Sequence, residues 1–217
     1  VSEHVAHSWY EDYEGGRHPF EGRTVPYATG EEGRKYSWAK APRYTDRPAE
    51  TGPLAESLIS RNPLLGDVLA KQGNSAFARQ LARLTRPALL IPTMEIWLDE
   101  TTGDGDYYKS PGDIVQGEGF GLSQAARGAI GHWVQIEGKR IKRYQIITPT
   151  AWHASPRDAN GVRGPMEEAL VGTPVADPEN PIELGHVVRS FDACLVCTVH
   201  TVVKGRTAAK KTLDVTP

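Results

Sequence analysis

The chain contains only two cysteines, Cys194 and Cys197, and both lie in the stretch DACLVCTVH at residues 192–200. Two cysteines cannot build the disulfide framework that holds many small secreted domains together. The 217-residue chain is 39% hydrophobic, which is enough to bury a substantial core in one large domain or two small ones. The CxxC spacing brings two sulfur atoms close together, which favours a metal site or a redox pair.

The charge balance argues against two classes of partner. The chain carries 25 Lys and Arg against 27 Asp and Glu, for a net charge of −2. This near-neutral balance disfavours nucleic acid and membrane surfaces as main partners. The sequence has no run of about 18 apolar residues that would span a membrane, so any membrane association would be indirect. Because the chain starts at Val1 rather than Met, we expect a processed, truncated or split product.

Residues 1–53 read as loop and extended segments, with dense aromatic residues separated by Gly, Pro and charges. Such a segment is better suited to coat a larger body than to fold alone. Within it, the charge run EEGRK at 31–35 predicts a solvated loop, and Arg43 is expected either to be structural or to contact a partner subunit.

Helical patterns begin after this segment. A short helix is expected over 52–60 and another short piece over 67–72. A long helix is expected over 75–100, because it opens with a serine that can cap it and its apolar residues recur at near-helical spacing. Pro87 and Pro92 are expected to kink or split this helix.

The rest of the chain mixes strands and short helices. Residues 99–121 read as loop, and 131–147 read as a hairpin that turns at 137–139. A short helix is expected over 166–172, and Asn180 is expected to cap a last helix that starts at Pro181 and leads to the cysteines. The predicted fold class is mainly α with small β elements.

The residues alone leave several metal sites open. Thiolate pairs suit zinc, iron–sulfur clusters, copper(I) or nickel. A closed zinc site with three or four cysteines is excluded within the chain, but two cysteines, His200 and a second histidine remain possible ligands; the candidates are His132, His153 and His186. For His132, beside Trp133, a satisfied core histidine is the favoured interpretation. Both cysteines could also be buried small hydrophobic residues.

Six motifs together resemble one family. The stretch SFDACLVCTVH resembles the carboxy-terminal DPCxxCxxH signature of nickel–iron hydrogenase large subunits. The family's other motifs have counterparts in the same order: HVAHSWY, YSWAKAPRY, TGPLA, GLSQAARGAIGHW and ITPTAWHASPRD. The resemblance runs over residues 1–200. Alanine in AARG and DAC, where many members have proline, is similar to the uptake-type branch. The family fold is mostly helical with small sheets.

The resemblance implies a set of metal ligands. Cys194 would be a terminal nickel ligand, and Cys197 would bridge nickel to an iron that carries CO and two cyanides. His200 and the backbone carbonyl of Ile146 would bind a magnesium or similar ion nearby. Soft thiolates at the nickel agree with the chemistry of that metal.

The resemblance also implies neighbours of the metals. Arg127 would stand above the open metal site, where its guanidinium can polarise hydrogen, help move its proton or donate to a cyanide. Asp192 would orient Arg127. The hydroxyl of Thr150 would donate to the other cyanide, and Ile130 would line the apolar pocket around CO. An ordinary Arg127–Asp192 ion pair is the plainer interpretation of the same two residues.

The family pattern requires more than this chain supplies. The amino-terminal CxxC and a proton-carrying glutamate are absent, so a fragment or a split subunit is expected, and this chain alone is expected to be inactive. The implied partners are the missing amino-terminal segment and a small subunit with iron–sulfur clusters. The implied reaction is hydrogen oxidation. We expect a location in the cytoplasm or on the inner face of the membrane, with export alongside a partner left open.

The end of the chain matches a known feature of the family. Residues 1–200 would be the domain, and residues 201–217 would be an extension that a maturation endopeptidase removes between His200 and Thr201 after a nickel chaperone has delivered the metal. The tail would keep the thiolates reachable until then. Two rivals remain: a binding module that holds zinc or nickel through Cys194, Cys197 and His200 without redox chemistry, and an unprocessed, non-catalytic precursor.

Overall fold

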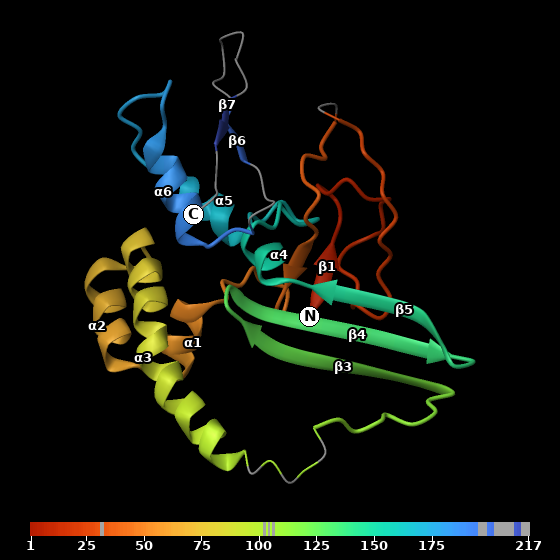
Figure 1. The fold of residues 1–217 in the computed structure, drawn as a ribbon. Helices are drawn as coiled ribbons and strands as arrows, with labels where there is room; N and C mark the ends of the chain where they lie inside the picture. Colours follow the sequence, from red (N-terminus) through yellow and green to blue (C-terminus); the bar gives the residue numbers. More distant parts are fainter. Residues whose placement is uncertain are drawn as a thin grey trace.

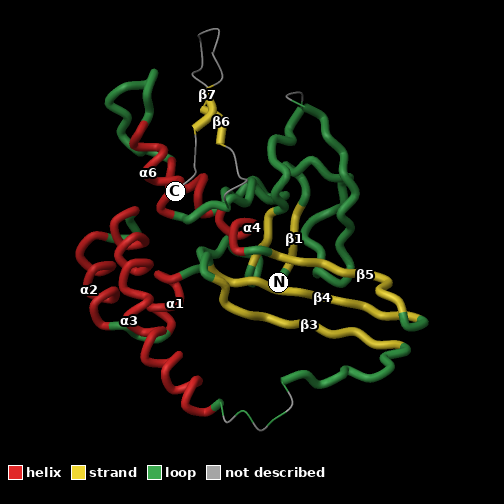
Figure 2. Tube along the Cα trace, in the orientation of Figure 1, coloured by secondary structure: helices red, strands yellow, loops and turns green. Residues whose placement is uncertain are grey.

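The computed structural model describes residues 1–30, 33–101, 103, 105 and 107–194, together with the backbone of two short strands at 199–201 and 211–213. Helices and small sheets share the chain, as the fold-class prediction states (Figures 1 and 2). The helices are α1 (Pro53–Ile59), α2 (Pro63–Gln72), α3 (Ala76–Glu100), α4 (Pro149–His153), α5 (Pro165–Leu170) and α6 (Ile182–Ser190).

The strands form three antiparallel sheets. One pairs β1 with β2, one has the order β3–β4–β5, and one pairs β6 with β7. Their bounds are β1 (Ser2–His4), β2 (Ala41–Arg43), β3 (Gln116–Ala125), β4 (Gly128–Glu137), β5 (Arg140–Ile147), β6 (Val199–Thr201) and β7 (Lys211–Leu213).

The helices α1 to α3 form one packed group beside the sheet (Figure 1). Ser75 caps α3 as predicted and accepts a hydrogen bond from the Ala78 amide. The helix α2 starts earlier than the expected residue 67, because Asn62 caps it by accepting a hydrogen bond from the Leu65 amide. Leu65 and Ala78 then pack with Leu54 and other small residues in a buried cluster. Capping therefore sets where these helices begin, and burial of their apolar sides holds them together.

The long helix α3 runs without a break through Pro87 and Pro92, so of the two expected effects, a kink or a split, the split does not occur. A proline removes only its own amide hydrogen bond, and the neighbouring turns keep theirs. The helix continues well beyond α1 and α2, and its far end protrudes from the body (Figure 1).

The loop expected over 99–121 is partly wrong, because β3 starts at Gln116. This strand pairs with β4 from Gln116↔Glu137 to Ala125↔Gly128. Its glycine-rich sequence lacks the alternating pattern of a strand. Backbone hydrogen bonds to β4 stabilise it in place of side-chain packing. The hairpin itself is confirmed, with β4 and β5 joined at Gly138 and Lys139.

The last helix starts one residue later than expected. Pro181 is the N-cap of α6, with no side-chain cap bond, so the prediction that Asn180 caps Pro181 is wrong. The backbone of Pro181 has ψ 67°, outside the helical range, and the first helical residue is therefore Ile182. The carboxy-terminal end of α6 packs Val188 and Phe191 against Met166 of α5 in a second buried cluster.

The amino-terminal segment is mostly loop, as expected, and two buried cations hold it in place. Lys35 belongs to the charge run predicted to be solvated, but it is buried and donates to three backbone carbonyls and to Asp12. The three carbonyl oxygens accept hydrogen bonds from its ammonium group, which offsets the cost of burying the charge. Arg43 is fully buried and donates to Asp158 at 2.8 Å, so its role in the described structure is structural.

Candidate functional site

Arg127 lies in the tight turn between β3 and β4, and the helix α3 holds that turn. Arg86 of α3 donates to the carbonyls of Ala125 and Ala126 at 3.3 and 3.2 Å. The loop before α1 presses on the other side, where Gly52 lies so close that an added Cβ would be 2.9 Å from the Arg127 carbonyl oxygen. The turn is thus fixed from two sides, which limits where the Arg127 side chain can reach.

Asp192 faces Arg127, a contact that both the resemblance and the plainer ion-pair interpretation predict. The Arg127 Nε lies 3.4 Å from one carboxylate oxygen of Asp192, and the Nε of Arg83 lies 3.5 Å from the other. Asp192 has φ +54°, a left-handed backbone conformation that is uncommon outside glycine. Since the side chains are partly exposed, the ion pairs add little stability. The effect of the arrangement is to orient the two guanidinium groups toward Asp192.

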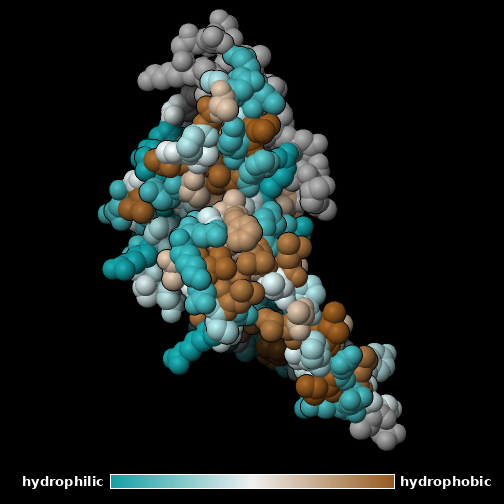
Figure 3. All heavy atoms as spheres, turned by 90° about the vertical axis from the view of Figure 1, so that its left-hand side faces the viewer, coloured by the Kyte–Doolittle hydropathy of each residue, from teal (hydrophilic) through white to brown (hydrophobic). Residues whose placement is uncertain are grey.

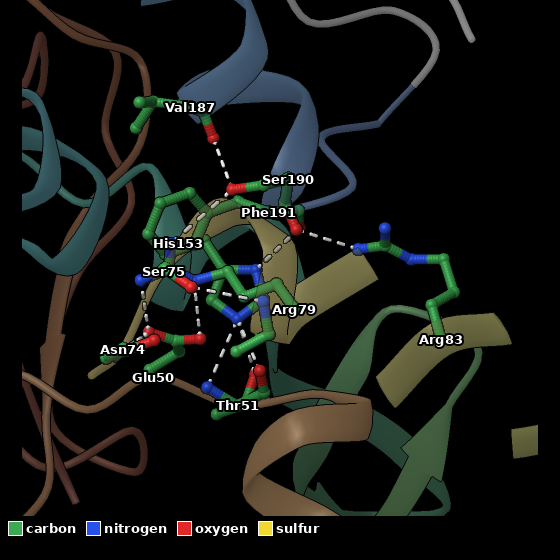
Figure 4. A network of polar contacts seen from close by, with 11 residues as sticks. Glu50, Thr51, Asn74, Ser75, Arg79, Arg83, His153, Val187, Ser190 and Phe191 are labelled. Atoms are coloured by element: carbon green, nitrogen blue, oxygen red, sulfur yellow. Dashed lines mark hydrogen bonds and ion pairs between the residues drawn. The ribbon is translucent and has the colours of Figure 1, made fainter. Parts of the chain in front are cut away.

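Two further side chains from α3 hold the end of α6 (Figure 4). Arg83 donates to the Ser190 carbonyl at 2.9 Å, and the guanidinium of Arg79 stacks on the Phe191 ring at 3.9 Å. Arg79 is fixed in turn by two hydrogen bonds to Glu50. Burial lowers the pKa of Arg83, and the facing Asp192 carboxylate opposes that shift.

The sequence interpretation missed these arginines. Arg79, Arg83 and Arg86 stand at spacings of four and three residues, so they share one side of a helix. A basic stripe on a helix that is otherwise apolar is the signal that could have found them. The stripe reaches Glu50, Asp192 and Glu56, which lie on three different segments.

His153, a candidate second zinc ligand, uses its ring for another purpose. The side chain is buried at the end of α4, with Nδ1 3.1 Å from the Phe191 carbonyl oxygen and Nε2 3.1 Å from the Thr51 amide nitrogen. Burial lowers its pKa. With both ring nitrogens facing backbone groups, His153 is not available to a zinc ion.

The other predicted histidines also give no metal cluster. His132 is only half-buried, and its Nδ1 lies 2.6 Å from the Tyr144 hydroxyl, so it is a satisfied histidine but not a core one. Neighbouring residues of a strand point to opposite faces, so the buried Trp133 does not imply that His132 is buried too. Among the residues that the structure describes, no three His, Cys, Asp or Glu side chains gather closely enough to hold a metal ion.

The thiol region is described only in part. Cys194 carries a free, half-buried thiol two residues after Asp192. Cys197 lies outside the described residues. His200 and Thr201 lie in β6, where His200 pairs with Thr212 of β7, but only their backbone is described.

Three further predicted residues share one end of the sheet. Ile130 lies near the start of β4 and Ile146 near the end of β5, and the antiparallel pairing brings these strand ends together through His132↔Ile146. Thr150 follows in α4, which contacts β4. Arg127 stands at this same end, so the backbone gathers the predicted pocket residues there.

A buried carboxylate beside this strand was not predicted. Glu3 is buried and accepts a hydrogen bond from Gln145, the neighbour of Ile146, at 2.8 Å. Lys40 lies 3.9 Å away and is also buried. Burial raises the pKa of Glu3 against the effect of Lys40. The one sequence signal for Glu3 was a charged residue close to the apolar Val5.

The family model for nickel-dependent hydrogenases matches residues 1–200. The chain belongs to this family. It is 38% identical to the periplasmic [NiFeSe] hydrogenase large subunit of Desulfomicrobium baculatum, over 92% of this chain and 42% of the relative. It is 32% identical to an uptake hydrogenase large subunit of Bradyrhizobium diazoefficiens, over 92% and 40%.

Solved hydrogenases share the fold. The H2-activated [NiFeSe]-hydrogenase of Dm. baculatum matches with a TM-score of 0.80 and 36% identity, over 89% of this chain and 43% of that one. The reduced Ni-Fe-Se hydrogenase of D. vulgaris Hildenborough also has a TM-score of 0.80, at 32% identity. The chain therefore spans about two fifths of the length of the hydrogenases that it matches.

The described donors fit part of a nickel–iron centre. A free thiol is the soft ligand that nickel accepts, and Asp192, two residues before it in the chain, pairs with Arg83 and Arg127. The described residues contain no complete ligand set. Cys194 would hold nickel together with Cys197 and with ligands from outside this chain.

Proposed function

We propose that this chain is the part of a nickel–iron hydrogenase large subunit that supplies Cys194, Cys197 and Arg127 to the catalytic centre. The observation that carries the proposal is the Arg127–Asp192 pair, which joins the β3–β4 turn to the residues just before the CxxC motif. Two segments 65 positions apart, 192 minus 127, thus meet two positions before Cys194 in the sequence. When bound, the nickel–iron group with its CO and cyanide ligands supplies the cleavage of H2 into two protons and two electrons.

The residues of this chain would bind the metals, orient the groups around them and accept the proton. Cys194 and Cys197 would provide thiolates, and Asp192 would keep the Arg127 guanidinium aimed at the open side of the centre. The proton would pass to a cysteine thiolate, or to Arg127 where its side chain is in the neutral guanidine form, because the guanidinium has no lone pair to accept it. Thr150 would donate to a cyanide, Ile130 would line the CO pocket, and the Ile146 carbonyl with His200 would bind a magnesium-type ion.

The far half of α3 supports a polypeptide partner. From Pro87 to Glu100 every residue except Thr93 is exposed, and the apolar residues there point to all sides of the helix. They form the brown surface along the protruding end in Figure 3, and they are Leu89, Leu90, Ile91, Met94, Ile96, Trp97 and Leu98. A helix that is apolar all round belongs inside a larger protein. We propose that the remaining large-subunit sequence surrounds it, and that an iron–sulfur small subunit completes the enzyme.

The carboxy-terminal tail is proposed to be a maturation extension. The family match ends at residue 200, and the proposed cleavage between His200 and Thr201 falls within β6. A maturation endopeptidase would remove 201–217 after a nickel chaperone has acted. Until then, the extension would keep the thiolates reachable for metal loading.

The proposal also covers the cellular location of the enzyme and its branch of the family. No helix in the described part of the chain is long and apolar enough to cross a membrane. We propose a cytoplasmic site or the inner membrane face; the periplasmic relative from Dm. baculatum keeps export with a partner open. We propose the uptake branch on the alanines at 126 and 193 and on the uptake-type relatives.

The test combines metal content, intact mass and activity on the assembled protein. We expect nickel and one non-cluster iron per complex, a chain ending at His200, and H2-dependent dye reduction. Cys194→Ser should abolish nickel retention and activity, because a hard hydroxyl replaces a soft thiolate. Wild-type nickel content in Cys194→Ser would overturn the proposal. Zinc in place of nickel and iron would favour the binding module, and an intact tail without nickel would favour the precursor.

A further inference from the structure

His153 connects two parts of the molecule through its two ring nitrogens. Its ring lies between the loop before α1 and the end of α6 (Figure 4). Nδ1 is 3.1 Å from the Phe191 carbonyl oxygen, and Nε2 is 3.1 Å from the Thr51 amide nitrogen. The ring also lies 5.5 Å from the Phe191 ring, centroid to centroid.

The Phe191 carbonyl decides where one ring proton lies. A carbonyl oxygen can only accept, and a backbone N–H can only donate. The bond to Phe191 therefore requires a proton on Nδ1. At Nε2 the partners are mixed, because the Thr51 amide nitrogen at 3.1 Å can only donate, whereas the Thr51 carbonyl oxygen at 2.9 Å can only accept.

The bond to Phe191 controls the direction of the chain. The Phe191 carbonyl and the Asp192 amide belong to one rigid peptide plane. His153 holds the carbonyl side, and the amide side donates to Arg189 O at 2.9 Å. With both sides held, the plane cannot rotate. That orientation allows the left-handed backbone of Asp192, from which its carboxylate reaches Arg127 and the chain proceeds to Cys194.

The bond to Thr51 anchors the ring to the opposite half of the site. Gly52, next to Thr51, lies against the Arg127 carbonyl, and Gly128 leaves no room for a Cβ beside Thr51. The same loop thus contacts both the turn that carries Arg127 and the histidine that holds Phe191. The two halves of the Arg127–Asp192 pair share one support.

We propose that His153 is a positioning residue: by holding the Phe191 carbonyl it fixes the turn that sets Asp192 against Arg127 and limits the motion of the Cys194 thiol. The inference rests on the proposed function in that Cys194 is taken as a metal ligand. It does not assign His153 a contact with the metals.

The test measures the thiol directly. The full chain, reduced and freed of metal, is treated with iodoacetamide, and alkylation of Cys194 is followed by peptide mass spectrometry separately from Cys197. His153→Ala should speed alkylation of Cys194 roughly tenfold, because one buried hydrogen bond that restrains the turn is lost. His153→Asn should stay close to the unsubstituted chain, because its amide nitrogen can occupy the place of Nδ1.

Two further variants separate positioning from plain stability. His153→Gln directs its amide toward the place of Nε2, so it should behave like His153→Ala. Val5→Ala, a buried change in the amino-terminal segment, should lower Tm without changing the alkylation rate of Cys194. Equal rates for the Asn and Gln variants, or the same increase in Val5→Ala, would overturn the proposal, even if His153→Ala does not fold.

Nitrogen-15 NMR of the His153 ring provides an independent check. The proposal requires a proton on Nδ1, and a proton on Nε2 alone would contradict it. Neither measurement uses nickel or H2. Their failure would leave the proposed function standing, while that function fails by the metal content of Cys194→Ser.

Discussion

The two halves of α3 are one continuous helix with opposite surroundings. The first half buries Ala78, Arg79 and Ala82 and sends its arginines to Glu50, Asp192 and Glu56. The second half buries none of its side chains, and Leu98, for example, is 71% exposed. The backbone is helical in both halves, although Pro87 and Pro92 lack an amide hydrogen in the second. Both halves form a helix, but only the first half packs against other parts of this chain. Tertiary contacts, not helix formation, therefore decide which half is buried.

The strongest way to break the comparison is to remove one anchor from the first half. Arg79→Ala should destabilise the chain by about 3 kcal/mol, because it strands the Glu50 carboxylate and removes the stack on Phe191. The matched change in the second half, Leu98→Ala, should cost less than about 0.5 kcal/mol. Urea unfolding of both variants is the measurement. Equal losses would mean that the second half is packed after all.

His153 of α4, whose pKa Arg79 of the first half affects, should make stability depend on pH. Burial first, and then the nearby Arg79, lower the pKa of His153, whereas Glu50 and the backbone contacts raise it, for a net lowering. The unfolded chain therefore binds a proton first as pH falls below about 6.5, so stability is full above that pH and declines toward the folded-state pKa.

His4 has a lowered pKa for the same main reason, burial, and contributes in the same direction. The contribution of His153 is isolated by subtraction. Unfolding free energies across the range from neutral to mildly acidic pH should fall less steeply in His153→Asn than in the unsubstituted chain. An unchanged slope would show that His153 titrates alike in the folded and unfolded states.

The smallest expected effect on folding comes from charging the second half. Ile96→Glu together with Leu98→Glu should change the unfolding free energy of this chain by less than about 0.5 kcal/mol, because both side chains are exposed. The same variant should self-associate less and lose assembly with the remaining large-subunit polypeptide. Size-exclusion chromatography with and without coexpression measures both. A large loss of stability would place these residues in a core of the chain itself.

Several elements were predictable because their causes are local. Ser75 caps a helix, and Gly138 with Lys139 turns a hairpin, since each depends on residues within a few positions. The strand β3 was missed because its glycines carry no alternating pattern, and only its pairing with β4 makes it a strand. Lys35 was missed because its acceptors are carbonyls, which no sequence pattern displays.

By itself the sequence determined the chemistry of the site: two thiols at CxxC spacing, an arginine in one motif and an aspartate in another. Residue type and order are sufficient for that. Only the tertiary structure decided that Arg127 meets Asp192 and that α3 supplies the arginines around them. Only it showed His153 tying Phe191 to Thr51. These contacts join residues far apart in the chain, so their geometry exists only after the helices and the sheet have packed.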